Sequence, residues 1–173
     1  MRGNPRIIVA IAGNGVLYVA LYVLNHWLAR GNVHVFAEAL YILFPAFYLK
    51  PVPGLLISGL SALFLDAISP VPFGSRFLLY AAAFILLIFI RQRLRREKGA
   101  HIAGAALIVN ALLFLALTFI ATPERLGEGH FWFRAIADLL LSEAVILLIA
   151  FRFVEAQRQV LFNVGTDVAA ETT

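Results

Sequence analysis

Residues 73–98 read FGSRFLLYAAAFILLIFIRQRLRREK, an apolar run that stops abruptly at a cluster of basic residues. Arg76 is the only charged residue between positions 73 and 90, whereas residues 91–98 carry five Lys or Arg. A helix that crosses a bilayer needs roughly 20 mostly apolar residues, and Lys and Arg collect at its cytoplasmic end. This stretch therefore predicts a transmembrane helix that ends at the cytoplasmic surface.

The composition of the whole chain supports the same interpretation. Of its 173 residues, 62% are hydrophobic and 14% are charged, whereas soluble domains average about 45–50% apolar and about 25% charged residues. A soluble globular protein is therefore excluded. The chain has no Cys, which rules out disulfides, thiolate metal sites and cysteine nucleophiles. Its net charge of +4 is scattered among apolar runs, so we expect no nucleic-acid partner.

Clusters of charge and Pro/Gly turns divide the chain into six apolar segments. We predict an all-α polytopic membrane protein with a single integral membrane domain, six transmembrane helices and a short cytoplasmic tail over residues 155–173. The links are short, so neighbouring helices should run antiparallel. The predicted spans are, approximately, residues 7–29, 33–49, 52–69, 73–90, 102–121 and 131–154.

The distribution of basic residues predicts the orientation. If the amino terminus is cytoplasmic, ten of the 14 Lys and Arg residues fall on the cytoplasmic side, as the positive-inside rule requires. Both termini are then cytoplasmic. The densest group should anchor the chain to anionic lipid headgroups, with docking of a cytoplasmic protein as the alternative. This cytoplasmic basic loop comprises Arg91, Arg93, Arg95, Arg96 and Lys98.

Ionisable side chains inside lipid are costly, so each one is a candidate for function. The predicted topology places most of them towards the outer ends of the helices. Arg134 and Asp138 are four residues apart, as a neutralised pair would be, although they could also line a pocket or bind a partner. Glu143 lies closer to the midplane, where Asn110 or Asn14 could hydrogen-bond to it. The predicted polar cluster contains His34, Glu38, Arg76, Arg134, Asp138 and Glu143.

Signals for catalysis, cofactors and metals are weak. His34 and Glu38 have a spacing that could ligate a metal, but a protein site needs at least three such ligands and no third is apparent. Ser61 follows Gly59 and Leu60 without a recognisable base, so we interpret it as a packing residue. Gly54, Ser58 and Ala62 recur every four residues and predict a face for close helix packing, although this small face leads to Asp66 and could also help to build a polar cavity. We expect neither enzymatic activity nor a cofactor.

One segment carries a pattern of residues that is typical of a known family. Phe44-Pro45 is followed by Gly59-Leu60, by Asp66, and by SPVPFG at residues 69–74, before the apolar run with the Arg-rich end. This pattern resembles the MreD family of rod shape-determining membrane proteins. The resemblance implies that certain residues shape the third and fourth helices and their outer turn against a partner. These motif residues are Gly59, Asp66, Ser69, Pro72 and Gly74.

The resemblance also implies a function. Such proteins are non-catalytic scaffolds of the bacterial elongation machinery in the inner membrane, and they help to organise peptidoglycan synthesis and maintain rod cell shape. The expected partner is an MreC-like membrane protein, and through it the MreB filament and RodA with a class B penicillin-binding protein. The implied fold is similar to the substrate-capture component of energy-coupling-factor transporters.

Two other functions stay open. The chain could itself be such a substrate-capture component, with the outer polar residues lining a vitamin site. Those components dock through an Ala-x-x-x-Ala motif in the first helix, and residues 7–29 lack it. An intramembrane enzyme is a weaker alternative, because no nucleophile and base can be paired.

Overall fold

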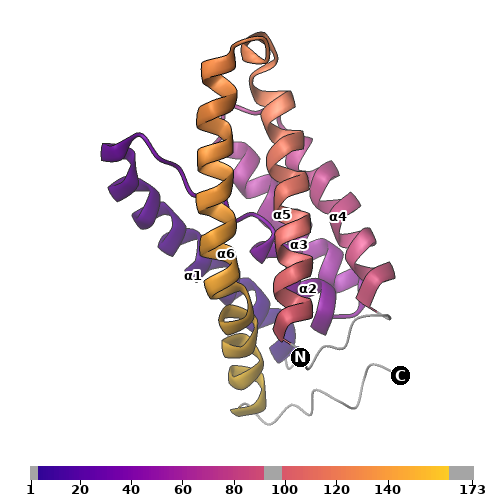
Figure 1. Cartoon of the computed structure of the whole chain (residues 1–173). Helices are drawn as coiled ribbons and strands as arrows, with labels where there is room; N and C mark the ends of the chain where they lie inside the picture. Colours follow the sequence, from indigo (N-terminus) through magenta and orange to yellow (C-terminus); the bar gives the residue numbers. More distant parts are fainter. Residues whose placement is uncertain (1–3, 92–98, 164–173) are drawn as a thin grey trace.

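The computed structural model describes residues 4–91 and 99–163, and every regular element in these ranges is a helix (Figure 1). The six-helix, all-α prediction is therefore confirmed. Two short 3-10 turns, Ala29–Gly31 and Pro123–Arg125, follow the first and fifth helices. The helices are α1 Pro5–Leu28, α2 Leu40–Tyr48, α3 Pro51–Ala67, α4 Ser75–Arg91, α5 Gly99–Ala121 and α6 Gly129–Asn163.

Two helical stretches in the described part of the chain are long and apolar enough to cross a membrane, Pro5–Gly31 and Ala100–Ala121. Only 17% of the most apolar window in the first stretch is buried, and 39% in the second. Most of this apolar surface therefore faces outward, as it does in helices surrounded by lipid rather than by protein. Helices α1, α3 and α5 finish at the same end of the bundle, and we call this end the outer end.

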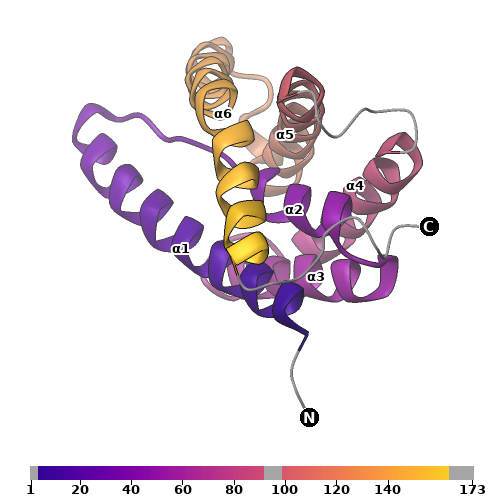
Figure 2. The ribbon, with the colours of Figure 1, turned by 90° about the horizontal axis from the view of Figure 1, so that it is seen from below.

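Helix α2 lies at the centre of the bundle, with the other five helices around it (Figure 2). All nine of its residues are buried. It contains Pro45, and Pro51 begins α3 directly after the short link that follows. Proline suits the first turn of a helix because it has no N–H to leave unsatisfied there. The fold is thus a ring of longer helices around one short buried helix.

The prediction of one continuous helix over residues 33–49 is wrong for its first half. Residues 33–37 have no regular secondary structure, a turn follows, and α2 begins only at Leu40. Asn32 ends the preceding 3-10 turn with a left-handed φ of 58°, which redirects the chain. A short, mostly apolar run such as residues 33–49 looks the same whether it is helical or extended, so hydropathy could not detect this change.

Helix α6 is longer than the predicted span of 131–154, because it continues to Asn163. Its buried side chains recur every three or four residues through Ala150, Val154, Gln157 and Leu161, which is the period of a helix packed along one face. Residues 155–163 of the predicted tail therefore belong to this helix. The remainder of that tail, residues 164–173, lies outside the described residues.

Helices α3 and α4 pack closely because α3 presents small residues to the aromatic rings of α4. A Cβ added at Gly54 would lie 2.8 Å from both the Phe84 ring and the Pro45 carbonyl oxygen, and one at Gly59 would lie 2.7 Å from the Phe77 ring. Ser58 on the same face is fully buried. The predicted close-packing face on α3 is confirmed.

Candidate functional site

The polar side chains of α1, α5 and α6 gather on the irregular segment 33–39 and replace the hydrogen bonds that a helix would supply. Asn25 holds Val35 at both backbone groups: its Oδ1 accepts from the Val35 N–H at 2.7 Å, and its Nδ2 donates to the Val35 carbonyl at 2.9 Å. Ser142 Oγ accepts from the Phe36 N–H at 2.8 Å. Buried backbone polar groups need such partners, above all where lipid excludes water.

Asn110 is the most heavily used of these side chains and is fully buried. Its Nδ2 donates to the Phe36 carbonyl at 2.9 Å and to Glu143 Oε1 at 3.1 Å, and its Oδ1 accepts from the Ala39 N–H at 3.4 Å. The predicted contact of Glu143 with Asn110 is confirmed. Glu143 therefore supports the residue that holds the irregular segment.

Arg134 and Asp138 do not form the pair that their spacing predicts, and that interpretation is wrong. Arg134 Nη2 donates to the Asn32 carbonyl at 3.0 Å, and Asp138 Oδ1 accepts from the His34 N–H at 3.2 Å. The physical reason is that unsatisfied backbone groups of the incoming segment lie opposite this face of α6. Both residues fix the entry of the segment at the outer end.

A second group of charges joins three elements. Arg76 Nε donates to Glu38 Oε1 at 2.9 Å, and Arg76 Nη1 lies 3.4 Å from Asp66 Oδ1. The side chain of Asp66 has no exposed surface, and those of Arg76 and Glu38 are about one-tenth exposed. Glu38 precedes α2, Asp66 lies in the last turn of α3 and Arg76 lies in the first turn of α4. We call this group the Arg76 triad.

Asp66 also closes the connection between α3 and α4. Its Oδ2 accepts from the Gly74 N–H at 2.9 Å, and its carboxylate accepts from the Arg76 N–H at 3.2–3.3 Å. Gly74 has a φ of +93°, a backbone conformation that favours glycine. Ser69 and Pro72 contribute backbone hydrogen bonds to the same connection. The five motif residues thus lie in this connection or, for Gly59, on the α3–α4 contact below it.

The first residue of the cytoplasmic basic loop has a partner inside the bundle. Arg91 Nη1 donates to the carbonyls of Ala46 and Leu49 at 3.0 and 3.3 Å, at the carboxyl end of α2. Cations are favoured there by the free carbonyl groups and the helix dipole. Arg93, Arg95, Arg96 and Lys98 lie outside the described residues, so the predicted lipid contact stays a prediction.

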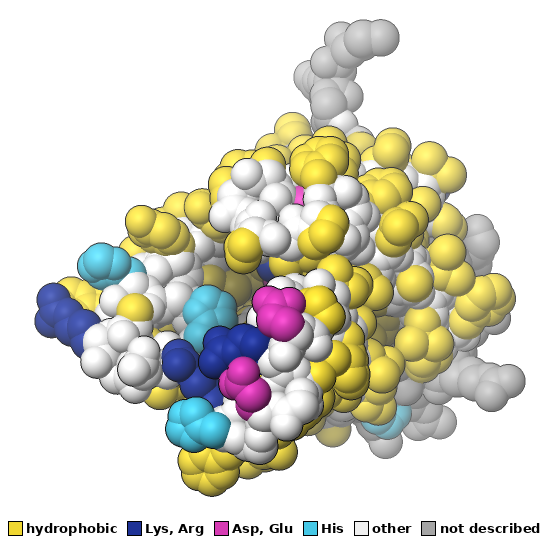
Figure 3. Space-filling model, turned by 90° about the horizontal axis from the view of Figure 1, so that it is seen from above, with side chains coloured by type: hydrophobic (Ala, Val, Ile, Leu, Met, Phe, Trp, Pro, Cys, Tyr) yellow, Lys and Arg dark blue, Asp and Glu magenta, His cyan; other side chains and the backbone are white. Residues whose placement is uncertain are grey.

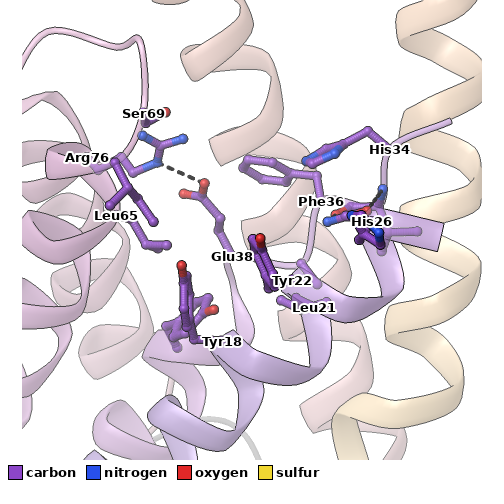
Figure 4. A pocket seen from close by; sticks show the side chains of 15 residues that line it. Tyr18, Leu21, Tyr22, His26, His34, Phe36, Glu38, Leu65, Ser69 and Arg76 are labelled. Carbon is purple, nitrogen blue, oxygen red and sulfur yellow. Dashed lines mark hydrogen bonds and ion pairs between the residues drawn. The ribbon is translucent and has the colours of Figure 1, made fainter. Parts of the chain in front are cut away.

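A cavity of about 440 Å³ opens at the outer end between α1, the irregular segment and the ends of α3 and α4 (Figure 4). Its volume is within the range of about 300–1,000 Å³ that is usual for small-molecule sites. Three residues of the predicted polar cluster line it, His34, Glu38 and Arg76, whereas Arg134, Asp138 and Glu143 do not. Seen from the outer end, charged and imidazole side chains gather around a hollow, and hydrophobic side chains cover much of the remaining surface (Figure 3).

Sequence reasoning missed the part of this cavity wall that α1 provides. Tyr18, Tyr22 and His26 line it from one face of that helix, and their spacing of four residues was the available signal. It also missed that Glu38, Asp66 and Arg76 meet, since the three residues come from different elements. Among the described residues, no group of three His, Asp or Glu side chains is arranged to hold a metal ion.

No protein family, no curated protein and no solved structure matches this chain.

Proposed function

We propose that the chain is a non-catalytic membrane scaffold of the bacterial elongation machinery, located in the inner membrane, with an MreC-like partner. The observation that carries the proposal is the α3–α4 connection. Residues of the MreD-like motif are those that hold this connection in one conformation, with Asp66 accepting the N–H groups of Gly74 and Arg76. A fixed connection at the outer end is what a scaffold needs in order to present a constant surface.

The surface beside this connection is apolar. Ile68, Phe73 and Leu78 are 57%, 72% and 70% exposed, although they flank a buried carboxylate that fixes the backbone. Exposed apolar side chains on a rigid support are suited to binding another membrane protein, because little conformational entropy is lost on contact. We therefore place the partner surface on this side of α3 and α4.

The lengths of the elements are compatible with six crossings, which would leave both termini on the same side of the membrane. Helix α2 has nine residues, so it reaches only about 14 Å. The five irregular residues 33–37 add roughly 17 Å when extended, and together the two parts match a hydrocarbon core of about 30 Å. The second crossing in this proposal is thus half irregular and half helical, shielded from lipid by the surrounding helices.

Copurification tests the scaffold proposal. The tagged chain, extracted in mild detergent, should bring with it a single-span membrane protein that has a periplasmic coiled coil, and through it RodA with a class B penicillin-binding protein and the MreB filament. Asp66→Ala should weaken this assembly and disturb rod shape more than Ser75→Ala does. Absence of such a partner from the wild-type preparation would refute the proposal.

A vitamin-capturing transporter subunit is the second candidate, and the outer cavity of about 440 Å³ favours it. In that case the purified chain should retain a tightly bound water-soluble vitamin, which mass spectrometry of the denatured protein would identify. Finding such a ligand, together with no MreC-like partner, would reverse the order of the two candidates.

A further inference from the structure

A second hollow, of about 280 Å³, lies deeper between α1 and α3. Tyr18, Tyr41 and Leu65 line both this hollow and the outer cavity, so the two adjoin. The rings of Tyr18 and Phe64 meet edge to face at 5.0 Å and bridge α1 and α3 at the junction. The two hollows therefore adjoin along the seam between α1 and α3, with the contact between Tyr18 and Phe64 at their junction. We call the deeper hollow the α1–α3 groove.

The α1–α3 groove is chemically suited to a hydrocarbon chain. Its walls are largely apolar, with Ile11 on α1 and Leu60 and Phe64 on α3. Asn14 faces it too, but its amide nitrogen already donates to the Tyr41 carbonyl at 3.1 Å and to Ser61 Oγ at 2.9 Å. Gly15 leaves room in the α1 wall, because a Cβ there would meet no atom within 4 Å.

The outer cavity, by contrast, is suited to an uncharged polar group. Its one cation, Arg76, is already opposed by the carboxylates of Glu38 and Asp66, so it offers no net positive charge to an anion. The remaining polar wall consists of the Asn25 amide, which is already bonded to Val35, and of hydroxyl and imidazole groups on Tyr18, Tyr22, Tyr41, His26, His34 and Ser69. Figure 4 shows the Tyr18 and Glu38 side chains facing the same space. Aromatic faces with neutral donors and acceptors recognise hydroxyl-bearing or carbonyl-bearing groups.

We propose that the two hollows form one site for a single-chain amphiphile with an uncharged, hydroxyl-bearing head. The head occupies the outer cavity, and the chain lies along the α1–α3 groove. Towards its outer end α1 leans away from the other helices (Figure 1; Figure 2), so the ligand can enter sideways from the bilayer. This inference goes beyond the scaffold proposal and does not depend on it.

The test uses the full chain in phosphatidylcholine nanodiscs and tritiated 1-monooleoylglycerol as the probe. We expect saturable binding of one molecule per chain. Unlabelled 1-monooleoylglycerol should displace the probe at least tenfold more effectively than oleate, which has the same chain and an anionic head. Glycerol, which has no chain, should not displace it. Equal displacement by oleate would overturn the assignment of a neutral head site, and displacement by glycerol at similar concentrations would overturn the chain groove.

Two variants in the groove locate the site, each with a matched control on α5. Gly15→Leu fills the groove from α1, and Gly104→Leu changes another helical glycine whose Cβ would also meet no atom within 4 Å. Leu60→Trp blocks the groove from α3, and Leu112→Trp alters a leucine of similar exposure, 54% against 62%.

We expect both groove variants to weaken 1-monooleoylglycerol binding at least tenfold and both controls to leave it unchanged. A thermal unfolding curve for each protein separates a blocked groove from a damaged fold. If the folded groove variants bind like wild type, or if the control variants lose binding equally, the probe is ordinary annular lipid and the proposal fails.

Discussion

Asp66 connects the local turn with the packing of three elements, because one buried carboxylate accepts from the Gly74 N–H and meets the guanidinium of Arg76. Asp66→Ala would leave the Gly74 and Arg76 N–H groups without their acceptor, whereas the Arg76 guanidinium would keep its ion pair with Glu38. Each buried polar group left unsatisfied costs about 1–3 kcal/mol, so we expect a fall in the thermal unfolding midpoint in detergent. Asp66→Asn, which keeps one acceptor, should lie between Asp66→Ala and wild type.

Ser75→Ala is the control for this prediction, because the Ser75 hydroxyl makes no hydrogen bond to another described residue. Its unfolding midpoint should match that of wild type. Equal midpoints for Asp66→Ala and Ser75→Ala would show that the carboxylate does not hold the α3–α4 connection.

Asn110 offers an independent residue-scale prediction on the other side of the bundle. Asn110→Leu would strand the Phe36 carbonyl, the Ala39 N–H and the Glu143 carboxylate. Each buried group left unsatisfied costs about 1–3 kcal/mol, so the free energy of unfolding should fall by at least that amount. Thr118→Val, on the same helix, removes a hydroxyl that bonds to no described side chain, and it should be neutral. A stable Asn110→Leu protein would mean that water replaces the amide.

At the scale of elements, the glycines of α3 and α5 should respond oppositely to alanine. Gly54→Ala would place a methyl group 2.8 Å from the Pro45 carbonyl oxygen and from the Phe84 ring, and overpacking of this kind costs about 1–3 kcal/mol. Gly104→Ala meets no atom within 4 Å and gains helix propensity of up to about 1 kcal/mol. Chemical or thermal unfolding of the two variants measures the difference, and a shift in the same direction for both would contradict it.

The elements also show what the sequence could predict. Apolar runs between charges located α1, α5 and the four other helices, because lipid-facing helices must be apolar over nearly their whole length. They failed at residues 33–39, where all residues except His34 and Glu38 are apolar, since a short, mostly apolar run can be helical or extended. The signal for the break lay elsewhere, in Asn25, Asn110 and Ser142, which supply the side-chain hydrogen bonds. Polar residues within the apolar runs thus marked an irregular backbone as much as a binding site.

The candidate site was predictable only in part, for the same physical reason. His34, Glu38 and Arg76 could be predicted as site residues from the sequence, because an ionisable side chain in lipid costs free energy and is therefore a candidate for function. The arrangement of these side chains could not be predicted, because Glu38 and Arg76 come from different helix ends. Their contact depends on how α2 packs against α4. A single sequence also does not distinguish an aromatic residue that packs in the core from one that lines a cavity, as Tyr18 and Tyr22 do.

At the scale of the whole molecule, the proposed topology makes the orientation depend on the segment between α4 and α5. Changing Arg93, Arg95 and Arg96 to Glu removes positive charge that should be retained in the cytoplasm and leaves Arg91, which binds the end of α2, intact. A carboxyl-terminal alkaline phosphatase fusion should be inactive in wild type, because the enzyme matures only outside the cytoplasm. It should gain activity in the triple variant as part of the population inverts.

Arg30→Glu combined with Arg125→Glu provides the matched control at the outer end. It makes that end more negative and should leave the wild-type fusion inactive, since the positive-inside bias is then strengthened. An active fusion on the wild-type chain would show that the carboxyl terminus lies outside the cytoplasm. A chain whose amino terminus is cytoplasmic could then not cross the membrane an even number of times. An inactive fusion on the triple variant would mean that the orientation is set by the seven other basic residues on the predicted cytoplasmic side, which are Arg2, Arg6, Lys50, Arg91, Lys98, Arg152 and Arg158.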